Sequence, residues 1–383
     1  MFHECARLYN GYDQRSGQSC CMMKSSKHYL FTPDGWWKSE DYTTSKAQME
    51  KGEFPDACDF CWRSIKNDKV GSTIFRPYND WPEGKGIEKN KLAILTLYVG
   101  NKCNLACRTC GAVSSTGWTK EHKKTVSRFT SLRKDLHLQP SMGFIQKWKD
   151  NIDVDISNLR VLEVLGGEPF YETEHLEFVD RLLLEADPSQ IEIFYSTNGT
   201  KALDKEIYDR LKYFKKVIIN FSIDAVGKPF EYIRTLGDWK QVDSNLKTWL
   251  SKCYGDYKYG LSVHIHPTLS VLNICYLDEL YDYMQDNNMH ETGFSPVIHP
   301  TWYSWNVLKH HQKEKISVPQ HSKHSAEWNH MLANHKYNGH RHKFHEAIQA
   351  TYEFRGLDIQ NYLPDLCQLM EIDKYYYNES ITN

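Results

Sequence analysis

Short runs of apolar, β-forming residues recur through the middle of the chain, and each run ends in a polar or glycine-rich segment. Runs of this length, rich in β-branched, aromatic and aliphatic side chains, predict strands. We expect strands at Leu92–Val99, Arg160–Leu165, Ile191–Tyr195, Val217–Phe221 and Leu261–His266. Between them, apolar residues fall at the i, i+3, i+4, i+7 spacing of amphipathic helices. One such set is Leu176, Val179 and Leu183, and another is Leu277, Leu280, Tyr281 and Met284.

The alternation of strands and helices predicts parallel β/α units and therefore an α/β fold. In closed or partly closed β/α barrels, functional side chains gather at the carboxyl ends of the strands. Four polar segments stand at those ends: Gly166–Pro169, Ser196–Gly199, Ser222–Asp224 and Pro267–Thr268. The pattern therefore predicts a functional site at the mouth of a barrel.

The loop after the first expected strand carries Cys103, Cys107 and Cys110. Three thiolates on a [4Fe–4S] cube leave one iron open to a ligand that the protein does not supply. A structural zinc site normally takes four protein ligands, commonly as two separated pairs, and three clustered cysteines fit that pattern poorly. A zinc knuckle and a cluster used only for electron transfer remain the alternatives for this loop.

This Cys-x3-Cys-x2-Cys spacing, followed by the run Gly166-Gly167-Glu168-Pro169, resembles the radical S-adenosylmethionine (SAM) superfamily. The resemblance covers roughly residues 92–300. It implies a partial (β/α)6 barrel with a [4Fe–4S] cluster whose open iron is chelated by the methionine moiety of SAM. Thr109 departs from the superfamily pattern, in which this position is often aromatic and lies near the adenine.

The resemblance also implies roles for individual residues at the strand ends. Gly166, Gly167 and Glu168 match the run that contacts the amino group of SAM. Ser222 and Asp224 match an element that reaches its carboxylate and ribose. Arg234 matches an arginine that pairs with the same carboxylate, a task that suits the planar fork of a guanidinium. Asn198 and Thr268 are further expected cofactor-binding residues.

The activity implied by this resemblance is reductive cleavage of SAM to methionine and a 5′-deoxyadenosyl radical, which abstracts hydrogen from a substrate. The cluster needs an electron donor such as flavodoxin or ferredoxin. The expected substrate is a peptide or protein side chain, or a small molecule. Modification of a nucleotide or RNA is the alternative reaction, and a non-catalytic iron–sulfur or zinc protein of the same fold is the alternative class.

Residues 1–90 form a polar, loop-rich segment with its own cysteines. The chain has 11 cysteines in 383 residues, and five of them lie here: Cys5, Cys20, Cys21, Cys58 and Cys61. A segment of this size gains stability from a metal staple. It resembles the twitch type of auxiliary-cluster module, which implies a second [4Fe–4S] cluster held by Cys5, Cys21, Cys58 and Cys61. Cys20 is the substitute for Cys21, and a zinc site with the same thiolates is the alternative.

Residues 301–383 are expected to form a helical extension of the barrel domain, which spans residues 91–300. Residues 324–355 read as a helix and residues 356–366 as a closing loop. The histidines of this region do not have zinc-site spacing, so we expect solvated or capping roles. The aromatic run Trp302–Trp305 suits either a wall of the substrate cavity or the core. The isolated Cys253, Cys275 and Cys367 read as small buried hydrophobes.

Charge and hydropathy restrict the partners. Lys and Arg number 47 against 49 acidic residues, a net charge of −2, so the chain lacks the overall basic footprint of a nucleic-acid-binding protein. The basic run Thr119–Lys134 reads as a solvated helix face, with phosphate or RNA binding as the alternative. No apolar stretch approaches the length of a membrane span and no signal-peptide pattern opens the sequence, so we expect a cytoplasmic protein without a membrane partner.

Overall fold

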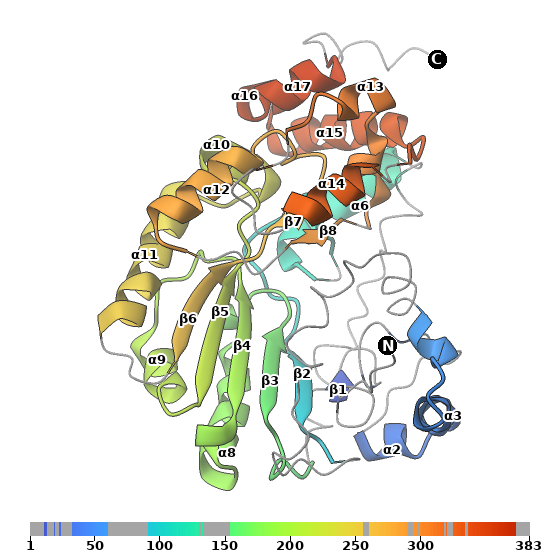
Figure 1. Cartoon of the computed structure of the whole chain (residues 1–383). Helices are drawn as coiled ribbons and strands as arrows, with labels where there is room; N and C mark the ends of the chain where they lie inside the picture. Colours follow the sequence, from blue (N-terminus) through green and yellow to red (C-terminus); the bar gives the residue numbers. More distant parts are fainter. Residues whose placement is uncertain are drawn as a thin grey trace.

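The computed structural model describes residues 11–13, 19, 23, 33–59, 91–112, 114–129, 132, 154–255, 260–289, 294–297, 299–317, 319, 325–333 and 336–372. Its centre is a sheet of six parallel strands in the order β1-β2-β3-β4-β5-β6 (Figure 1). The strands are β1 Gly11–Asp13, β2 Ile94–Tyr98, β3 Val161–Leu165, β4 Glu192–Thr197, β5 Lys216–Phe221 and β6 Leu261–Ile265. The strands expected from the sequence are confirmed as β2 to β6, with each boundary within two residues of its expected place.

β1 is an addition that the hydrophobic pattern did not reveal. It pairs with β2 in parallel, with Gly11 opposite Ile94 and Asp13 opposite Thr96. A strand this short has no readable period, and its place in the sheet depends on backbone pairing with a partner far along the chain. Part of the segment that we expected to be a separate N-terminal module therefore lies in the same sheet as the barrel strands.

After β6 the chain forms a second, two-stranded sheet. β7 (Thr268–Leu269) pairs in parallel with β8 (Ser295–Pro296), which takes the place of the sixth barrel strand. Pro267 interrupts the strand between β6 and β7, because proline has no N–H to give to a ladder. The result is an open, partial β/α barrel, as the sequence predicts.

Helices cover the outer face of the sheet and its carboxyl end. Along the outer side lie α8 Leu176–Glu185, α9 Lys205–Leu211, α10 Gly227–Ile233, α11 Trp239–Gly255 and α12 Leu277–Asp286 (Figure 1). The remaining helices are α2 Pro33–Trp37, α3 Glu40–Glu50, α6 Thr119–Arg128, α13 His310–Lys313, α14 Ser325–Ala333, α15 Arg341–Arg355, α16 Ile359–Tyr362 and α17 Pro364–Met370. The expected apolar face of α12 is confirmed, since all of its members are buried. On α8, Leu182 is fully buried and Leu183 only partly, so that face is turned by one residue from the expected one.

The C-terminal extension differs from its prediction in two places. The stretch expected to be helical is divided into α14 and α15, and the expected closing loop contains α16 and the start of α17. Gly356 ends α15 in the left-handed conformation, with φ 68°. Asp358 then caps α16 by accepting a hydrogen bond from the Gln360 N–H, and Pro364 occupies the first turn of α17. These local stop and start signals are short, and they define helices of a turn or two that apolar periodicity does not detect.

The aromatic run after β8 belongs to the core. Trp302 and Tyr303 are each 2% exposed, and Tyr303 packs edge-on against Phe344 of α15. This contact packs the aromatic run against α15 within the C-terminal extension. In Figure 1, α14, α15 and α6 lie together at the end of the sheet occupied by β7 and β8.

Candidate active site

The cysteine loop follows β2 and is fixed to its surroundings by backbone hydrogen bonds. The Ala106 N–H donates to the Thr235 carbonyl at 2.9 Å, and the Arg108 N–H donates to the Ile233 carbonyl at 2.8 Å. The indole of Trp118 donates to the Cys107 carbonyl at 2.9 Å. The loop is therefore held between the end of α10 and the segment that leads into α6.

The three thiols lie in one electrostatic environment. Cys107 is buried, whereas Cys103 and Cys110 are partly exposed. Burial raises the pKa of the Cys107 thiol to about 12; the Arg234 guanidinium opposes this rise, and Cys110 and Cys103 add to it. Arg234 Nη1 lies 3.8 Å from Cys107 Sγ, as a hydrogen-bond donor does.

The cysteine loop offers three free thiols to a metal centre. Among the described residues, no three His, Cys, Asp or Glu side chains stand close enough to chelate one ion. One zinc ion requires its thiolates within a single tetrahedron, whereas a cube distributes them over separate irons. Three thiols can therefore bind three irons of a cube, one on each.

Gly166 and Gly167 bring the end of β3 against the start of the cysteine loop. The Gly167 N–H donates to the Gly100 carbonyl at 2.8 Å, and the Glu168 N–H donates to the Lys102 carbonyl at 2.9 Å. A Cβ on Gly167 would lie 2.5 Å from the Lys102 carbonyl oxygen, and a Cβ on Gly166 would lie 2.8 Å from that of Gly100. Glycine is required here because backbone meets backbone, independently of any contact with a ligand.

Glu168 joins the ends of β3 and β4. Its carboxylate is fully buried and accepts hydrogen bonds from Thr197 Oγ1 at 2.8 Å, the Asn198 N–H at 2.6 Å and the Phe170 N–H at 3.2 Å. Burial raises the pKa of Glu168 to about 7, and these hydrogen bonds oppose the rise. The side chain expected to face SAM is therefore occupied within the protein, and it sets the conformation of the turn after β4.

Asn198, in that turn, contacts the cysteine loop directly. Its Nδ2 donates to Cys103 Sγ at 3.6 Å and to Asn104 Oδ1 at 3.0 Å. Thr200 shares in the contact by accepting a hydrogen bond from Asn104 Nδ2 at 2.9 Å. The sequence placed Asn198 in the site, but Asn104 and Thr200 carried no signal that marked them.

Asp224 and Arg234 form a buried pair behind Cys107. Asp224 Oδ2 accepts from Arg234 Nε at 2.7 Å, and its Oδ1 accepts from Arg234 Nη2 at 3.0 Å. Oδ1 also accepts the Thr268 N–H at 2.7 Å, and Asn273 Nδ2 donates to the Asp224 carbonyl at 2.9 Å. Asp224 thus holds together the ends of β5 and β7 and aims the guanidinium at the thiol.

Two other expected residues lie at the same end of the sheet. Ser222 is partly exposed, and its N–H donates to the Thr197 carbonyl at 2.8 Å. Thr268 is also partly exposed. Cys103 and Cys110 are partly exposed in the same way.

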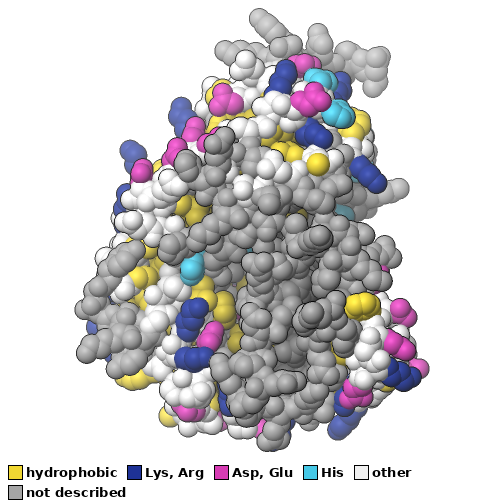
Figure 2. All heavy atoms as spheres, in the orientation of Figure 1, with side chains coloured by type: hydrophobic (Ala, Val, Ile, Leu, Met, Phe, Trp, Pro, Cys, Tyr) yellow, Lys and Arg dark blue, Asp and Glu magenta, His cyan; other side chains and the backbone are white. Residues whose placement is uncertain are grey.

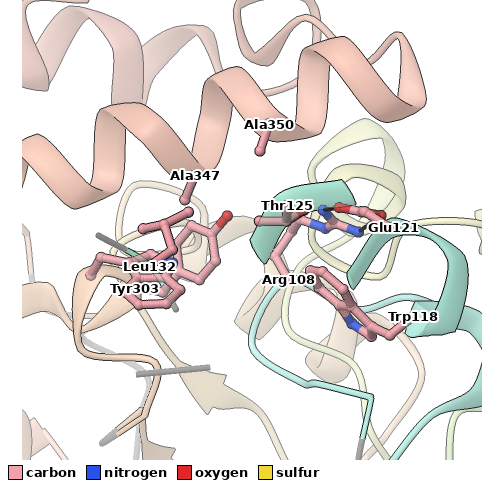
Figure 3. Close-up of a pocket in the computed structure, with 9 residues that line it drawn as sticks. Arg108, Trp118, Glu121, Thr125, Leu132, Tyr303, Ala347 and Ala350 are labelled. Atoms are coloured by element: carbon pink, nitrogen blue, oxygen red, sulfur yellow. Dashed lines mark hydrogen bonds and ion pairs between the residues drawn. The ribbon is translucent and has the colours of Figure 1, made fainter. Parts of the chain in front are cut away.

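A buried charge network supports the loop from behind. Arg108 lies between two of the cysteines and is 1% exposed. Its guanidinium stacks 4.4 Å from the Trp118 ring centroid and pairs with Glu121 at 2.6 Å, while Arg355 of α15 pairs with Glu121 at 2.5 Å. Figure 3 shows Arg108 turned toward Glu121 above the indole. Neither Arg108 nor Arg355 was expected from the sequence, because opposite charges so far apart along the chain carry no local pattern.

A small cavity separates this network from Tyr303 (Figure 3). It has a volume of about 10 Å³, the room of one water molecule. Arg108 and Thr125 are among the residues that line it, and Arg108 Nε and Thr125 Oγ1 have no hydrogen-bond partner within the described part of the chain. The cavity is too small for a substrate.

Most of the expected auxiliary-cluster ligands are not among the described residues. Cys5, Cys20, Cys21 and Cys61 lie outside the described residues. Cys58 is described, and it is buried at the end of a short turn of 3-10 helix, Asp56–Cys58.

Residues 97–284 match the family model of the radical SAM superfamily. A search of curated proteins found no match. Among solved structures, native anSMEcpe with bound AdoMet and Cp18Cys peptide is 18% identical over 58% of this chain and 58% of its own, with a TM-score of 0.34. Streptococcus suis SuiB bound to precursor peptide SuiA is 15% identical over 72% of this chain and 58% of its own, with a TM-score of 0.34. The chain thus spans 58% of the length of each.

The fold and the site define a class of protein: a partial β/α barrel with a three-cysteine loop at the carboxyl end of β2. The family match lies within that barrel, so residues 97–284 form a domain of the radical SAM type. None of the helices described is long and apolar enough to cross a membrane.

Proposed function

We propose that this protein is an active radical SAM enzyme whose catalytic cluster is held by Cys103, Cys107 and Cys110. The observation that carries the proposal is the placement of all three at the barrel mouth, with the Arg234 guanidinium 3.8 Å from one thiol. A reduced [4Fe–4S] cluster bound there would supply the electron that cleaves SAM to methionine and a 5′-deoxyadenosyl radical, which takes hydrogen from the substrate.

Arg234 is suited to receive the carboxylate of SAM. The hydrogen bonds to Asp224 and Cys107 use three of its five N–H donors, so two stay available to an anion. Asp224 anchors the guanidinium and keeps it ionised beside the cluster loop, while burial acts against that charge. The partly exposed Ser222 and Thr268 and the backbone of Gly166 and Gly167 complete the proposed SAM site.

The substrate that we propose is a peptide or protein side chain. On the face shown in Figure 2, basic side chains are interspersed with acidic ones. The basic residues Lys123, Lys124 and Arg128 lie on the exposed face of α6, and Arg128 is paired with Glu353 at 3.0 Å. A polyanion such as RNA favours a field of one sign, whereas the face in Figure 2 carries both signs.

The N-terminal region is proposed to hold a second [4Fe–4S] cluster on Cys5, Cys21, Cys58 and Cys61. Grouped thiols in a reducing compartment suit metal binding, and Cys58 is already buried at the start of its Cys-x2-Cys pair. This cluster would accept an electron from the substrate radical or bind the substrate.

Anaerobic reconstitution tests the activity. We expect the wild-type protein, given dithionite and SAM, to produce 5′-deoxyadenosine, and the Cys103/Cys107/Cys110 triple alanine variant to produce none. Cys253→Ala is the matched control, because Cys253 lies in α11 with its thiol directed at the Trp249 carbonyl, and it should keep the wild-type yield. A fully loaded wild-type protein that leaves SAM intact would identify a non-catalytic iron–sulfur protein.

Deuterated candidates test the substrate class. Label from a side chain of the correct peptide should appear in 5′-deoxyadenosine, while label from the ribose or base of RNA should not. The reverse result would overturn the peptide proposal and leave the radical chemistry in place.

A further inference from the structure

The carboxamide of Asn198 uses all of its hydrogen-bonding capacity inside the protein. Nδ2 donates to Cys103 Sγ at 3.6 Å and to Asn104 Oδ1 at 3.0 Å. Oδ1 accepts from the Thr200 N–H at 2.9 Å and from Thr200 Oγ1 at 2.7 Å. An amide has two donors and an oxygen with two acceptor sites, so no capacity is left for SAM.

The orientation of this amide is determined by its partners. If Oδ1 and Nδ2 exchanged places, an NH2 group would face the Thr200 N–H, and a carbonyl oxygen would face a thiolate. Each of those contacts is repulsive, and Asn198 is 6% exposed, so water cannot replace the lost partners. The backbone N–H of Asn198 is held by Glu168 at 2.6 Å, which fixes the turn that carries the amide.

We propose that Asn198 is a positioning residue that donates a hydrogen bond to the Cys103 thiolate and raises the reduction potential of the cluster, and that it is not a SAM ligand. This inference rests on the proposed function, since it requires a cluster on the cysteine loop. A donor aimed at a ligand sulfur stabilises negative charge there. The reduced cluster carries one more negative charge than the oxidised cluster, so the donor favours reduction.

Arg234 acts on Cys107 in the same way, but it is a poor probe because removing it also leaves Asp224 buried without its partner. Asn198 is neutral, and its removal leaves no charge uncompensated. The potential shift that follows its substitution therefore reports on the contact with sulfur.

The test is an EPR-monitored redox titration of the reconstituted SAM-binding cluster without SAM, in a Cys58→Ala/Cys61→Ala background that removes the proposed second cluster. Asn198→Ala should shift the potential to a more negative value, and Asn198→Asp should shift it further, because a carboxylate then faces the thiolate. Thr200→Val, which removes one of the two hydrogen bonds that hold Oδ1, should give a smaller shift in the same direction. SAM affinity should stay within about threefold of the parent value in the alanine variant.

Asn245→Ala is the matched control. Asn245 is also a buried amide that steadies this turn, donating to the Gly199 carbonyl at 2.9 Å, and it has no contact with sulfur. Its loss should lower the melting temperature and leave the potential unchanged. An equal shift in Asn245→Ala would show that general loosening of the turn is responsible, and it would overturn the proposal.

Two further outcomes separate the proposals. An unchanged potential in Asn198→Ala together with a loss of SAM affinity of about tenfold or more would make Asn198 a SAM ligand and overturn the inference alone. If the parent protein fails to bind about four irons on the cysteine loop, the proposed function itself fails. Where Asn198→Ala does not take up a cluster, Thr200→Val decides the question.

Discussion

Single atoms decide how the site is assembled. One Cβ on Gly167 would collide with the Lys102 carbonyl, and one oxygen of Asp224 holds both Arg234 and the N–H of Thr268. Each of these contacts joins two strand ends or a strand end and the cysteine loop. The polar residues at the barrel mouth therefore stabilise the structure of the site through contacts within the protein, without any ligand.

Gly167→Ala should destabilise the protein by about 1–3 kcal/mol and loosen the cysteine loop, because the added carbon meets backbone atoms that cannot move aside. Denaturant unfolding and iron content after reconstitution measure the two effects. Gly111→Ala is the control from the same loop, since a Cβ there has nothing within 4 Å. Equal stability of the two variants would contradict the close approach.

Glu168 predicts a pH dependence. Its folded pKa of about 7 lies above the value of an unfolded glutamate, so the folded state holds the proton more tightly. The stabilisation is complete below about pH 4.5 and is lost as the pH rises through about 7. Relative to Glu168→Gln, the wild-type protein should lose about 2–3 kcal/mol of unfolding free energy between pH 5 and 8. Chemical denaturation of both proteins across this range measures this loss. A difference in unfolding free energy between the wild type and Glu168→Gln that stays constant or rises with pH would contradict the raised pKa of Glu168.

Among the helices, α6 and α15 act as a clamp on the cysteine loop. Arg108 of the loop and Arg355 of α15 share the carboxylate of Glu121 on α6; Arg108 and Glu121 are buried, and Arg355 is partly exposed. Burial acts against charge on Glu121, but the two guanidinium groups hold the pKa of its carboxyl below its usual value. The C-terminal extension is thereby tied to the back of the site.

Glu121→Gln should be strongly destabilising, by about 3–5 kcal/mol, because it leaves two guanidinium groups without their common anion. The control is the exposed pair between the same helices: Arg128, with 49% of its side chain exposed, can be replaced by alanine at a cost of about 0–1 kcal/mol. Chemical denaturation of both variants gives the comparison. Similar losses in the two would show that Glu121 contributes no more than a surface pair.

At the scale of the whole molecule, the barrel and the N-terminal cysteines predict two metal centres that can be removed separately. Wild-type protein should bind about eight irons, and the Cys103/Cys107/Cys110 triple alanine variant about four, given four irons per cube. Cys58→Ala/Cys61→Ala should also retain about four and still cleave SAM. Iron and sulfide analysis with a zinc assay distinguishes these results from a zinc site, in which the wild-type protein would carry about four irons and one zinc.

The sequence by itself determined the parallel β/α pattern, the cysteine loop and the polar strand ends, because each depends on residues that lie close together in the chain. It missed β1, the short helices α16 and α17, and the clamp of Arg108, Glu121 and Arg355. Those features depend on residues far apart in the chain: Asn198 meets Cys103 across 95 positions, and Arg355 meets Glu121 across 234. Only the tertiary structure decided that Gly166, Gly167, Glu168 and Asn198 make their contacts with other parts of the protein. A hydrogen bond depends on which groups the fold brings within about 3 Å of one another.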